Sequence, residues 1–428
     1  MRILITGATG FIGSHIMRTL LLDGHQVVGC TRHPGTVMPH HPNAAFIQAD
    51  YATDHAVADW LPRVSDMDIV INAVGIIREQ GNQTFASLHT KGPIALFRAC
   101  EKAGVKKVIQ ISALGADDTA FSQYHLSKKA ADDHLATLAL NWLVLMPSIV
   151  YGKGAKSMAF FKAIAGLPWI PLVDRGDQPI QPIHISDLTK LISGVVKSPS
   201  ALKKRCEIVG PAPITMKALY TKLREWLGLG SPRFFSIPYP VALRLARWGR
   251  FLGSTPMTDE TVAMLRKGNT GDVGQFVDQT WDLPKSIDQR LIDTPSQDSD
   301  RWHAGLYFLR PALRLSIAFV WLFTGFISAF AVPTETSYAM LAKAGISGVF
   351  APLMLYGAAA TDILLGIAVL IRYRMTLSGW TQISLILLYT LIISISQPEQ
   401  WLHPFGPVTK NAPLIMAILI MMVLEKRQ

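Results

Sequence analysis

The glycine pattern at the start of the chain, within residues 3–13, constrains the fold more than any other feature. An apolar run typical of a short buried strand ends at Gly7, and Gly10 and Gly13 follow where an apolar helical periodicity begins. Gly7 permits a tight turn, Gly10 lets a pyrophosphate approach the backbone, and Gly13 lets helix and strand pack closely. The helix start adds unpaired N–H groups and the positive end of its dipole. We therefore expect a dinucleotide site whose loop residues are Gly7, Thr9, Gly10, Phe11, Ile12 and Gly13.

Short apolar runs alternate with helical stretches up to residue 152. Strands are expected near Ile3, Val27 and Phe46 and within residues 69–73, 108–112 and 142–146. This alternation predicts an α/β fold, a doubly wound parallel sheet with helices on both faces. We assign residues 1–152 to an NAD(P)-binding Rossmann core and residues 153–285, richer in proline turns, to a small substrate lobe interleaved with it. The polar residues 286–308 predict a linker.

The last third of the chain holds most of the apolar excess. Half of all residues are hydrophobic, and four apolar runs follow residue 309, at 315–332, 350–371, 377–395 and 412–424. The first three are long enough to cross a bilayer as helices, whereas the fourth spans only if its neighbours also lie at membrane depth. Residues 309–428 therefore predict an all-α transmembrane domain of four helices.

The basic residues around these runs predict an orientation. With four spans, one side of the membrane would carry Arg310, Arg314, Arg372, Arg374, Lys426 and Arg427. Cytoplasmic loops carry the excess of Lys and Arg, so a multi-pass protein with its N-terminal domain and its C-terminus in the cytoplasm is expected. Within the second run, Asp362 has two readings: a functional carboxyl, or a helix–helix hydrogen bond with a residue such as Gln382.

Composition bounds the partners. The formal charge is +11, and residues 203–267 carry twelve basic and four acidic side chains, which suits a surface facing anionic lipid. No groove-reading motif or aromatic platform accompanies the charge, so nucleic acid is not expected. The three cysteines have no paired spacing, as in a reducing cytoplasm, and His40-His41 lacks a third ligand, so no metal site is predicted. The first strand begins at once, so we expect no secretory signal.

Two residues after the second and third strands bear on cofactor choice. The second strand ends at Thr31-Arg32 without the acidic residue that accepts hydrogen bonds from a ribose 2′-OH. Arg32 instead suggests a partner for a 2′-phosphate, so NADP is favoured over NAD; the alternative is a surface arginine in a loop. Asp50 could accept from an adenine amino group, or it could cap the turn before the next helix.

The third signal is a serine, tyrosine and lysine set. Ser112 ends a predicted strand, and Tyr124 and Lys128 are four residues apart, which places both on one helical face. A nearby ammonium stabilises phenolate and would lower the pKa of Tyr124 toward the working range of a general acid or base. Ser112 would polarise a substrate carbonyl. The sequence thus predicts proton-transfer chemistry beside a nucleotide.

Over about the first 285 residues the chain resembles the extended and atypical short-chain dehydrogenase/reductase superfamily, in the branch with the nucleotide-binding accessory subunit of respiratory complex I. The motifs are residues 6–13, 72–75 (Asn-Ala-Val-Gly), 111–116 (Ile-Ser-Ala-Leu-Gly-Ala), Tyr124 with Lys128, 147–152 (Pro-Ser-Ile-Val-Tyr-Gly) and 181–184 (Gln-Pro-Ile-His). The resemblance implies that Tyr124 transfers a proton, Lys128 also holds the nicotinamide ribose and Ser112 orients the substrate. It implies further cofactor contacts from Ala73, Val74, Gly75 and Pro147.

Two positions depart from the family pattern. Met146 stands where many members have arginine, and Asp132 stands where a glutamate commonly follows the serine–lysine pair. Both departures concern substrate handling more than cofactor binding. The branch also contains members that bind NADPH without known turnover.

The C-terminal part resembles a DoxX-like four-helix membrane module, through residues 401–407 and Lys410-Asn411. Fusion of the two modules is known among bacterial proteins, which implies a bacterial inner-membrane location. Three functions remain open: a membrane-anchored NADP-dependent oxidoreductase acting on a lipid-like or quinone-like carbonyl or alcohol, an NADPH-binding scaffold or redox sensor that recruits membrane-protein partners, and an NAD-dependent epimerase or dehydratase.

Overall fold

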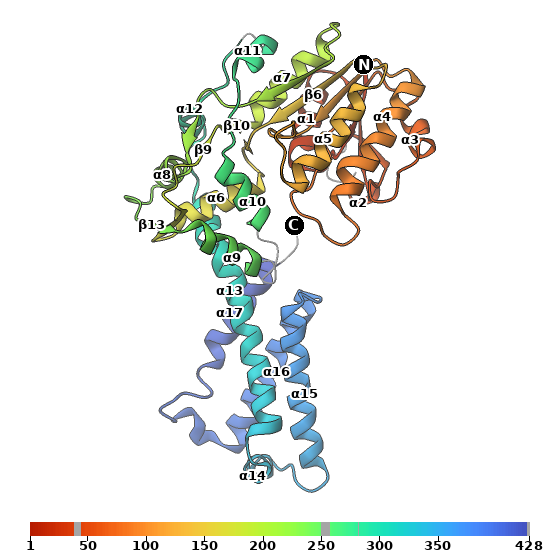
Figure 1. Ribbon diagram of the computed structural model, residues 1–428. Coiled ribbons are helices and arrows are strands. Elements are labelled where there is room, and N and C mark those ends of the chain that lie inside the picture. The colour runs from red at the N-terminus through yellow and green to blue at the C-terminus, as the bar shows by residue number, and fades with distance from the viewer. Residues whose placement is uncertain (38–43, 250–256, 281, 426–428) are drawn as a thin grey trace. The chain divides into compact units, whose positions relative to one another are not determined.

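The computed structural model describes residues 1–37, 44–249, 257–280 and 282–425, without the side chains of residues 248, 249, 279 and 280. Within it the chain divides into two compact units, Met1–Ala304 and Gly305–Gln428 (Figure 1). The predictions for His40, His41, Lys426 and Arg427 fall outside the described residues.

A seven-stranded parallel sheet forms the centre of the first unit, with strand order β11-β6-β5-β4-β1-β2-β3 (Figure 1). The strands are β1 (Arg2–Thr6), β2 (Gln26–Thr31), β3 (Ala45–Gln48), β4 (Ile69–Asn72), β5 (Lys107–Ile111), β6 (Trp142–Pro147) and β11 (Lys204–Ile208). All six strands expected from the sequence are present, and the predicted doubly wound parallel sheet is confirmed.

Helices cover both faces of this sheet because its buried strands present apolar side chains to each side. In β1, Ile3 and Ile5 belong to one core, which α1 and α7 cover, whereas Leu4 belongs to the other, which α3, α4 and α5 cover. The helices are α1 (Phe11–Leu22), α3 (Val57–Val64), α4 (Gly92–Ala103), α5 (Gln123–Ala136) and α7 (Ile185–Lys197), with a short α2 (Pro34–Val37).

The strand β11 was not expected from the sequence. It pairs in parallel with β6 at one edge of the sheet. Charged and apolar residues alternate only from Arg205 to Ile208, and Cys206 and Ile208 are the buried residues of this strand. The central strands are recognised by continuous apolar runs, and an edge strand that is covered on one face only lacks such a run.

A second lobe is folded from residues after β6. Its own core gathers side chains such as Ile170, Leu219 and Leu223. Its elements are β7 (Val150–Tyr151), α6 (Lys156–Gly166), β8 (Ile170–Val173), β9 (Pro179–Ile180), β10 (Ile183–His184), β12 (Ile214–Thr215), α8 (Met216–Trp226), β13 (Phe234–Ile237), α9 (Tyr239–Gly249), α10 (Asp259–Lys267) and α12 (Ile287–Asp293). The helix α11 (Gly274–Thr280) packs on the Rossmann core instead, where its Phe276 is buried. The strand β11 belongs to the Rossmann sheet and α7 covers one of its faces, although both follow β7 in the sequence. The Rossmann core and the second lobe are therefore interleaved along the chain.

The predicted linker, residues 286–308, is largely helical instead. Ser286 caps α12, accepting a hydrogen bond from the Gln289 N–H, and Ile287 is buried in the lobe core. The next helix, α13 (Asp298–Phe326), already begins at Asp298. Polar residues here cap helices, a role that composition does not distinguish from that of a loop.

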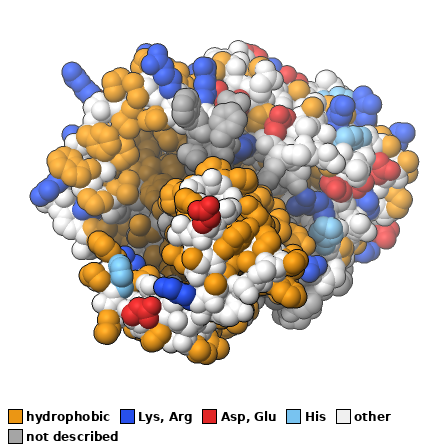
Figure 2. All heavy atoms as spheres, turned by 90° about the horizontal axis from the view of Figure 1, so that it is seen from below, with side chains coloured by type: hydrophobic (Ala, Val, Ile, Leu, Met, Phe, Trp, Pro, Cys, Tyr) orange, Lys and Arg blue, Asp and Glu red, His pale blue; other side chains and the backbone are white. Residues whose placement is uncertain are grey.

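The second unit is all helical. It comprises most of α13, a π-helical turn η3 (Ile327–Ala331), α14 (Thr334–Lys343), α15 (Phe350–Leu370), α16 (Met375–Ser396), a 3₁₀ turn η4 (Pro398–Trp401) and α17 (Asn411–Glu425). In the part of the chain that the structure describes, three helical segments are long and apolar enough to cross a membrane, Asp298–Ala331, Phe350–Leu370 and Met375–Ser396. The fourth predicted helix, α17, has 15 residues. Figure 2 shows many hydrophobic side chains on the surface, as expected for a lipid-facing unit; those exposed here include Phe319, Leu353, Leu364, Leu377 and Leu387.

The carboxyl of Asp362 is buried in this unit without a hydrogen-bond partner for Oδ1 among the described residues. The suggested bond with Gln382 is not formed. Gln382 Nε2 instead donates to the carbonyl and hydroxyl oxygens of Ser378, one turn earlier, at 3.1 and 3.2 Å. The amide nitrogen is thus satisfied within its own helix, whereas Gln382 Oε1 is buried without a hydrogen-bond partner among the described residues.

Candidate functional site

The loop between β1 and α1 has the geometry of a phosphate cradle. Gly7 has a left-handed backbone, with φ of 69°, and a Cβ there would lie 2.7 Å from the carbonyl oxygen of Ala73. A Cβ on Gly13 would lie 2.1 Å from the carbonyl oxygen of Gly7. Both positions therefore exclude a side chain, for the reasons expected from the sequence: a tight turn at Gly7 and close helix packing at Gly13.

The first turn of α1 offers hydrogen-bond donors. The first helical bond runs from Ser14 N–H to the Gly10 carbonyl at 2.9 Å, so the N–H groups of Phe11, Ile12 and Gly13 have no partner within the helix. No side chain caps this end. Because α1 and α4 cover opposite faces of the sheet and follow the neighbouring strands β1 and β4, the loop lies at the topological switch point. These features fit a pyrophosphate.

The other predicted cofactor residues lie along the carboxyl ends of the strands. Thr9 is exposed in the phosphate loop, and Ala73, Val74 and Gly75 directly follow β4. Pro147 ends β6, and its carbonyl accepts the Leu114 N–H at 3.0 Å. The carboxyl edge of a parallel sheet is where ligands of doubly wound folds bind.

Arg32 and Asp50 follow β2 and β3. Arg32 is exposed and makes no hydrogen bond or ion pair with any described residue. Asp50 Oδ1 accepts the N–H of Ala52 at 2.9 Å, and the Asp50 N–H donates to Asp54 Oδ2 at 2.9 Å. Asp50 thus fills the turn-capping role that was its alternative reading, through one of its two carboxylate oxygens.

Ser112 lies directly after β5, and its hydroxyl donates to Asp132 Oδ2 on α5. Asp132 is fully buried and also accepts from Gln110 Nε2 at 3.2 Å. Burial raises the pKa of Asp132 to about 6, although the hydrogen bond from Ser112 and the charge of Lys128 both oppose the rise. Asp132, which stands where the family commonly has a glutamate, therefore holds the Ser112 hydroxyl by a hydrogen bond.

A buried polar network extends from this carboxylate under the carboxyl ends of three strands. It runs from Asp132 to Gln110, from there to Asn72 and on to Thr6 and Tyr51. Asn72 Nδ2 donates to Gln110 Oε1 at 2.7 Å, and Asn72 Oδ1 accepts from Thr6 at 2.6 Å and Tyr51 at 2.9 Å. All these side chains are buried, so each hydrogen bond satisfies a polar group that would otherwise have no partner. The network therefore fixes the strand ends on which the site is built.

Lys128 is buried one helical turn before Asp132 on α5. Its Nζ donates to the carbonyl of Ile111 at 3.0 Å, at the end of β5. A Cβ on Gly75 would lie 3.4 Å from this Nζ, so the ammonium also lies against the loop that follows β4. Burial lowers the pKa of Lys128 to about 8, and Asp132 counters part of that effect.

Tyr124 is placed by the start of α5, where the hydroxyl of Ser122 accepts the His125 N–H at 3.1 Å and caps the helix. The predicted lowering of the tyrosine pKa by Lys128 is wrong in this structure. Lys128 Nζ lies 6.0 Å from the ring centre and bonds to the backbone, while burial, Asp132 and Glu260 raise the pKa of Tyr124.

His89 is a site residue that the sequence analysis missed. Its ring lies 5.5 Å from that of Tyr124 and stacks on Phe85 at 5.2 Å. Nε2 accepts the Ile76 N–H at 3.0 Å, so Nδ1 carries the proton and donates to Ser127 Oγ at 2.9 Å. Burial and the Lys128 charge lower the pKa of His89 to about 2, which keeps it neutral. It lies in a π-helical segment, η2 (Ala86–Lys91), and a single histidine carries no spacing signal.

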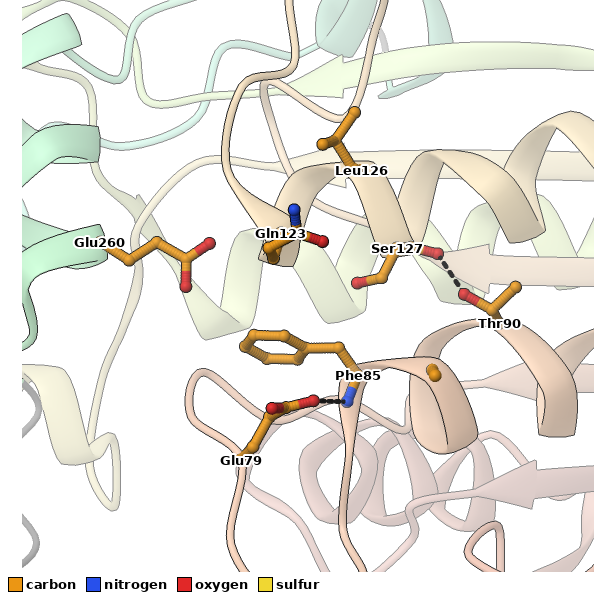
Figure 3. Close-up of a pocket in the computed structure, with 8 residues that line it drawn as sticks. Glu79, Phe85, Thr90, Gln123, Leu126, Ser127 and Glu260 are labelled. Atoms are coloured by element: carbon orange, nitrogen blue, oxygen red, sulfur yellow. Dashed lines mark hydrogen bonds between the residues drawn. The ribbon is translucent and has the colours of Figure 1, made fainter.

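An open pocket of about 550 Å³ lies beside the first turns of α5 (Figure 3). Its lining is Glu79, Phe85, Ala86, Thr90, Gln123, Leu126, Ser127 and Glu260. Glu260 extends into the pocket from α10 of the second lobe and accepts a hydrogen bond from the Tyr124 N–H at 3.0 Å. Glu79 accepts a hydrogen bond from the Phe85 N–H at 2.6 Å. The pocket thus combines apolar side chains with two carboxylate acceptors, and the ring centre of its Phe85 lies 6.1 Å from that of Tyr124.

The chain matches two family models. Residues 7–161 match an NAD(P)H-binding family, and residues 318–419 match the DoxX-like family. The first match covers the phosphate loop and the Ser112, Tyr124 and Lys128 set, and the second covers most of the helical unit.

Two curated relatives are similar to the chain. Subunit 9 of the NADH dehydrogenase [ubiquinone] 1 alpha subcomplex, a mitochondrial protein of Rattus norvegicus, is 26% identical over 301 residues, covering 68% of this chain and 76% of the relative. Ceramide reductase of Caulobacter vibrioides is 26% identical over 198 residues, covering 46% of this chain and 61% of the relative.

Solved structures share the fold. UDP-glucuronic acid 4-epimerase from Bacillus cereus, in complex with UDP-glucuronic acid and NAD, is 19% identical, with a TM-score of 0.54, covering 71% of this chain and 99% of that one. A nucleoside-diphosphate-sugar epimerase from Staphylococcus aureus is 18% identical with a TM-score of 0.54, covering 68% of this chain and 99% of the other. The chain therefore joins an NAD(P)-binding Rossmann domain, related to the complex I subunit and to ceramide reductase, to a C-terminal DoxX-like domain.

Proposed function

We propose that the protein is a membrane-anchored, NADP-dependent oxidoreductase that reduces a carbonyl group of a lipid-like substrate. The observation that carries the proposal is the position of Lys128, whose buried ammonium bonds to the end of β5 at 3.0 Å and lies against Gly75, with the Ser112–Asp132 pair one turn along the same helix. Residues 1–152 would form the nucleotide core, 153–285 the substrate lobe and 309–428 the membrane domain.

When bound, the nicotinamide cofactor supplies the hydride. The phosphate loop and the first turn of α1 would hold its pyrophosphate, and Lys128 its nicotinamide ribose. Residues 73–75 and Pro147 border the same edge of the sheet and would contact it there.

The protein's own residues would supply the proton. A tyrosine with a raised pKa stays protonated near neutral pH, so Tyr124 is suited to donate a proton to the carbonyl oxygen while the carbonyl carbon gains the hydride. Lys128, an ammonium below about pH 8, would stay at the Ile111 carbonyl and hold the nicotinamide ribose there. Ser112, held by Asp132, would orient the substrate oxygen.

The substrate class rests on the pocket and on a relative. The pocket offers Phe85 and Leu126 to an apolar chain, and the carboxylates of Glu79 and Glu260 to hydroxyl or amide donors. An amphipathic lipid with such donors fits this lining, and a relative in Caulobacter vibrioides is a ceramide reductase. A quinone-like substrate would use the apolar side chains but not the acceptors.

The choice of NADP over NAD rests on Arg32. The side chain is exposed directly after β2 and has no described partner, so it is available to a 2′-phosphate. We also propose a bacterial inner-membrane location with the Rossmann domain and the C-terminus in the cytoplasm. This orientation is supported by Arg310, Arg314 and Arg372, which meet at one carboxylate and therefore lie at one end of the helical unit.

A scaffold that binds NADPH without turnover is the second candidate. It is favoured by the likeness to subunit 9 of the NADH dehydrogenase [ubiquinone] 1 alpha subcomplex, which extends over 76% of that protein. Membrane-protein partners would then bind the helical unit. An epimerase or dehydratase would instead keep NAD tightly bound, and unexchanging NAD in the purified protein would support it.

The test uses purified full-length protein in detergent. NADPH binding is recorded by nicotinamide fluorescence, and NADPH consumption is then followed with a panel of lipid-like ketones and quinones. The enzyme reading expects that Tyr124→Phe binds NADPH but no longer consumes it, whereas Tyr220→Phe, a matched change in the lobe core, consumes it normally. Binding without consumption by the wild type on every substrate would favour the scaffold.

A further inference from the structure

Three arginines of the helical unit converge on one buried carboxylate, that of Glu425 at the end of α17. Arg310 on α13 contacts it with two nitrogens, Nε to Oε1 and Nη2 to Oε2, each at 3.1 Å. Arg314, one turn later on α13, reaches Oε1 at 3.3 Å, and Arg372, two residues after the end of α15, reaches Oε2 at 3.2 Å. We call Arg310, Arg314 and Arg372 the arginine cluster.

The arginine cluster carries more positive charge than Glu425 neutralises. Among the described residues, Arg310 and Arg314 have no carboxylate partner besides Glu425, so these two guanidinium groups alone exceed its charge by one. The Glu425 side chain is 2% exposed and that of Arg314 is 9% exposed, so much of this charge is removed from water. Charges buried at the end of an apolar helix bundle need a counter-charge to offset their lost hydration.

The cluster also has unused binding capacity. Arg314 Nε is buried and has no hydrogen-bond partner among the described residues. The side chains of Arg310 and Arg372 are each 41% exposed, so their guanidinium groups reach from the carboxylate to the surface. Arg372 has a left-handed backbone, with φ of 57°, a conformation that glycine adopts more easily than any residue with a side chain.

The position of the cluster suits a lipid headgroup. Arg310 precedes the apolar part of α13, Arg372 lies two residues after the end of α15, and Glu425 ends α17. The cluster therefore marks one end of three neighbouring apolar helices. Lipid phosphates lie at this depth, and basic pockets between membrane helices bind anionic headgroups. Guanidinium groups bind phosphate oxygens through paired N–H donors.

We propose that the arginine cluster and Glu425 form a binding site for a phosphate-bearing anion, and that the occupant is the headgroup phosphate of an anionic membrane lipid. The phosphate supplies the missing negative charge and accepts from guanidinium groups that Glu425 alone does not saturate. Neither the nucleotide site nor the DoxX-like match assigns this site.

The test compares charge-matched variants of the full-length protein in nanodiscs. Arg310→Gln and Arg372→Gln remove half-exposed members of the cluster. The control, Arg374→Gln, removes the same charge two residues after Arg372, from a guanidinium that lies 5.7 Å from the Tyr373 ring centre. Native mass spectrometry measures retained phosphatidylglycerol relative to phosphatidylcholine. We expect a selective retention that falls about tenfold in the two cluster variants and stays unchanged in the control.

Glu425→Gln separates a binding site from a structural ion pair. Without the competing carboxylate the arginine cluster should retain phosphatidylglycerol more strongly, even if the melting temperature falls. A purely structural role predicts a lower melting temperature with no gain in retention, which would overturn the proposal. The Glu425→Gln measurement also tests the lipid site if Arg310→Gln or Arg372→Gln fails to fold, as judged by circular dichroism.

A free anion is distinguished by a titration with inorganic phosphate in detergent. If phosphate raises the melting temperature as phosphatidylglycerol does and displaces the bound lipid at millimolar concentration, the lipid assignment is wrong. Equal loss of lipid selectivity in Arg374→Gln and Arg310→Gln would show that general surface charge, and not this site, holds the lipid.

Discussion

Replacing Asp132 with asparagine tests the buried carboxylate beneath Ser112. The substitution keeps the size of the side chain and removes its charge. The wild-type carboxylate accepts from both Ser112 and Gln110, whereas an asparagine amide offers one acceptor and one donor. Because Gln110 must donate to this side chain while its own oxygen accepts from Asn72, the amide nitrogen of the introduced asparagine would face Ser112 and turn its hydroxyl hydrogen away.

The magnitude follows from the pKa of Asp132, which burial raises from 3.8 to about 6. A folded-state pKa above the unfolded one means that the folded protein binds the proton more tightly. The resulting stabilisation is therefore present below about pH 4 and is lost as the pH rises through about 6. A difference of about 2 in pKa corresponds to about 3 kcal/mol. Asparagine does not titrate, so the variant escapes this loss.

The assay is the melting temperature of the first unit at several pH values between 4 and 7, for the wild type and for Asp132→Asn. For a unit of about 300 residues, 3 kcal/mol corresponds to about 5 °C. Subtracting the two curves cancels every other titrating group. We expect the variant to gain about 5 °C on the wild type between pH 4 and pH 7, whatever its constant offset from the changed hydrogen bonds.

Asp133→Asn is the matched control. Burial alone would raise the pKa of Asp133, but its ion pairs with Arg205 and Lys129 hold that pKa below the ordinary value. The ionised Asp133 stabilises the wild type, and this contribution is lost as the pH falls. As the pH rises, the melting temperature of Asp133→Asn should therefore fall relative to that of the wild type. A pH-independent difference for Asp132→Asn, or one with the sign of the control, would refute the assignment of a buried, ionisable carboxylate beneath Ser112.

Three further changes test the cofactor site. Gly13→Ala places a methyl group 2.1 Å from a backbone oxygen of the phosphate loop, so NADPH binding by fluorescence should weaken at least tenfold, whereas Gly35→Ala, which meets nothing within 4 Å, should leave it unchanged. Arg32→Ala should weaken NADPH about tenfold and NADH little, as measured by the two dissociation constants; equal effects would remove the basis for NADP. Deprotonation of Lys128 should lower kcat/KM above about pH 8, and in Lys128→Arg this decrease should begin at a higher pH. A decrease at the same pH in both proteins would show that another group causes it.

The sequence predicted the parts of the fold that rest on strong local signals. The central strands are recognisable because both of their faces are buried, as in β1, whose residues from Ile3 to Thr6 are all buried. The edge strand β11 was missed because the face opposite Cys206 and Ile208 carries the charged residues Arg205 and Glu207. Residues 286–308 were expected to be a linker because polar helix caps have the composition of loops.

The sequence indicates which residue types form the candidate site but not their electrostatics. A spacing of four places Tyr124 and Lys128 on one helical face, but it does not reveal that Lys128 bonds to the Ile111 carbonyl. Burial therefore raises the tyrosine pKa against the expectation. His89 and the role of Asp132 depend on contacts between elements distant in the sequence, which no spacing rule encodes.

The most direct measurement of the central claim is transfer of deuterium from NADPH labelled at the transferring position of the nicotinamide. The full-length protein and its Tyr124→Phe variant would each be incubated with labelled NADPH and bacterial membrane lipids, and the lipids would be examined by mass spectrometry. The account predicts a deuterium-labelled lipid with the wild type and none with the variant, although both bind NADPH. Binding by both proteins with no labelled lipid from either would contradict hydride transfer and leave the cofactor a structural role.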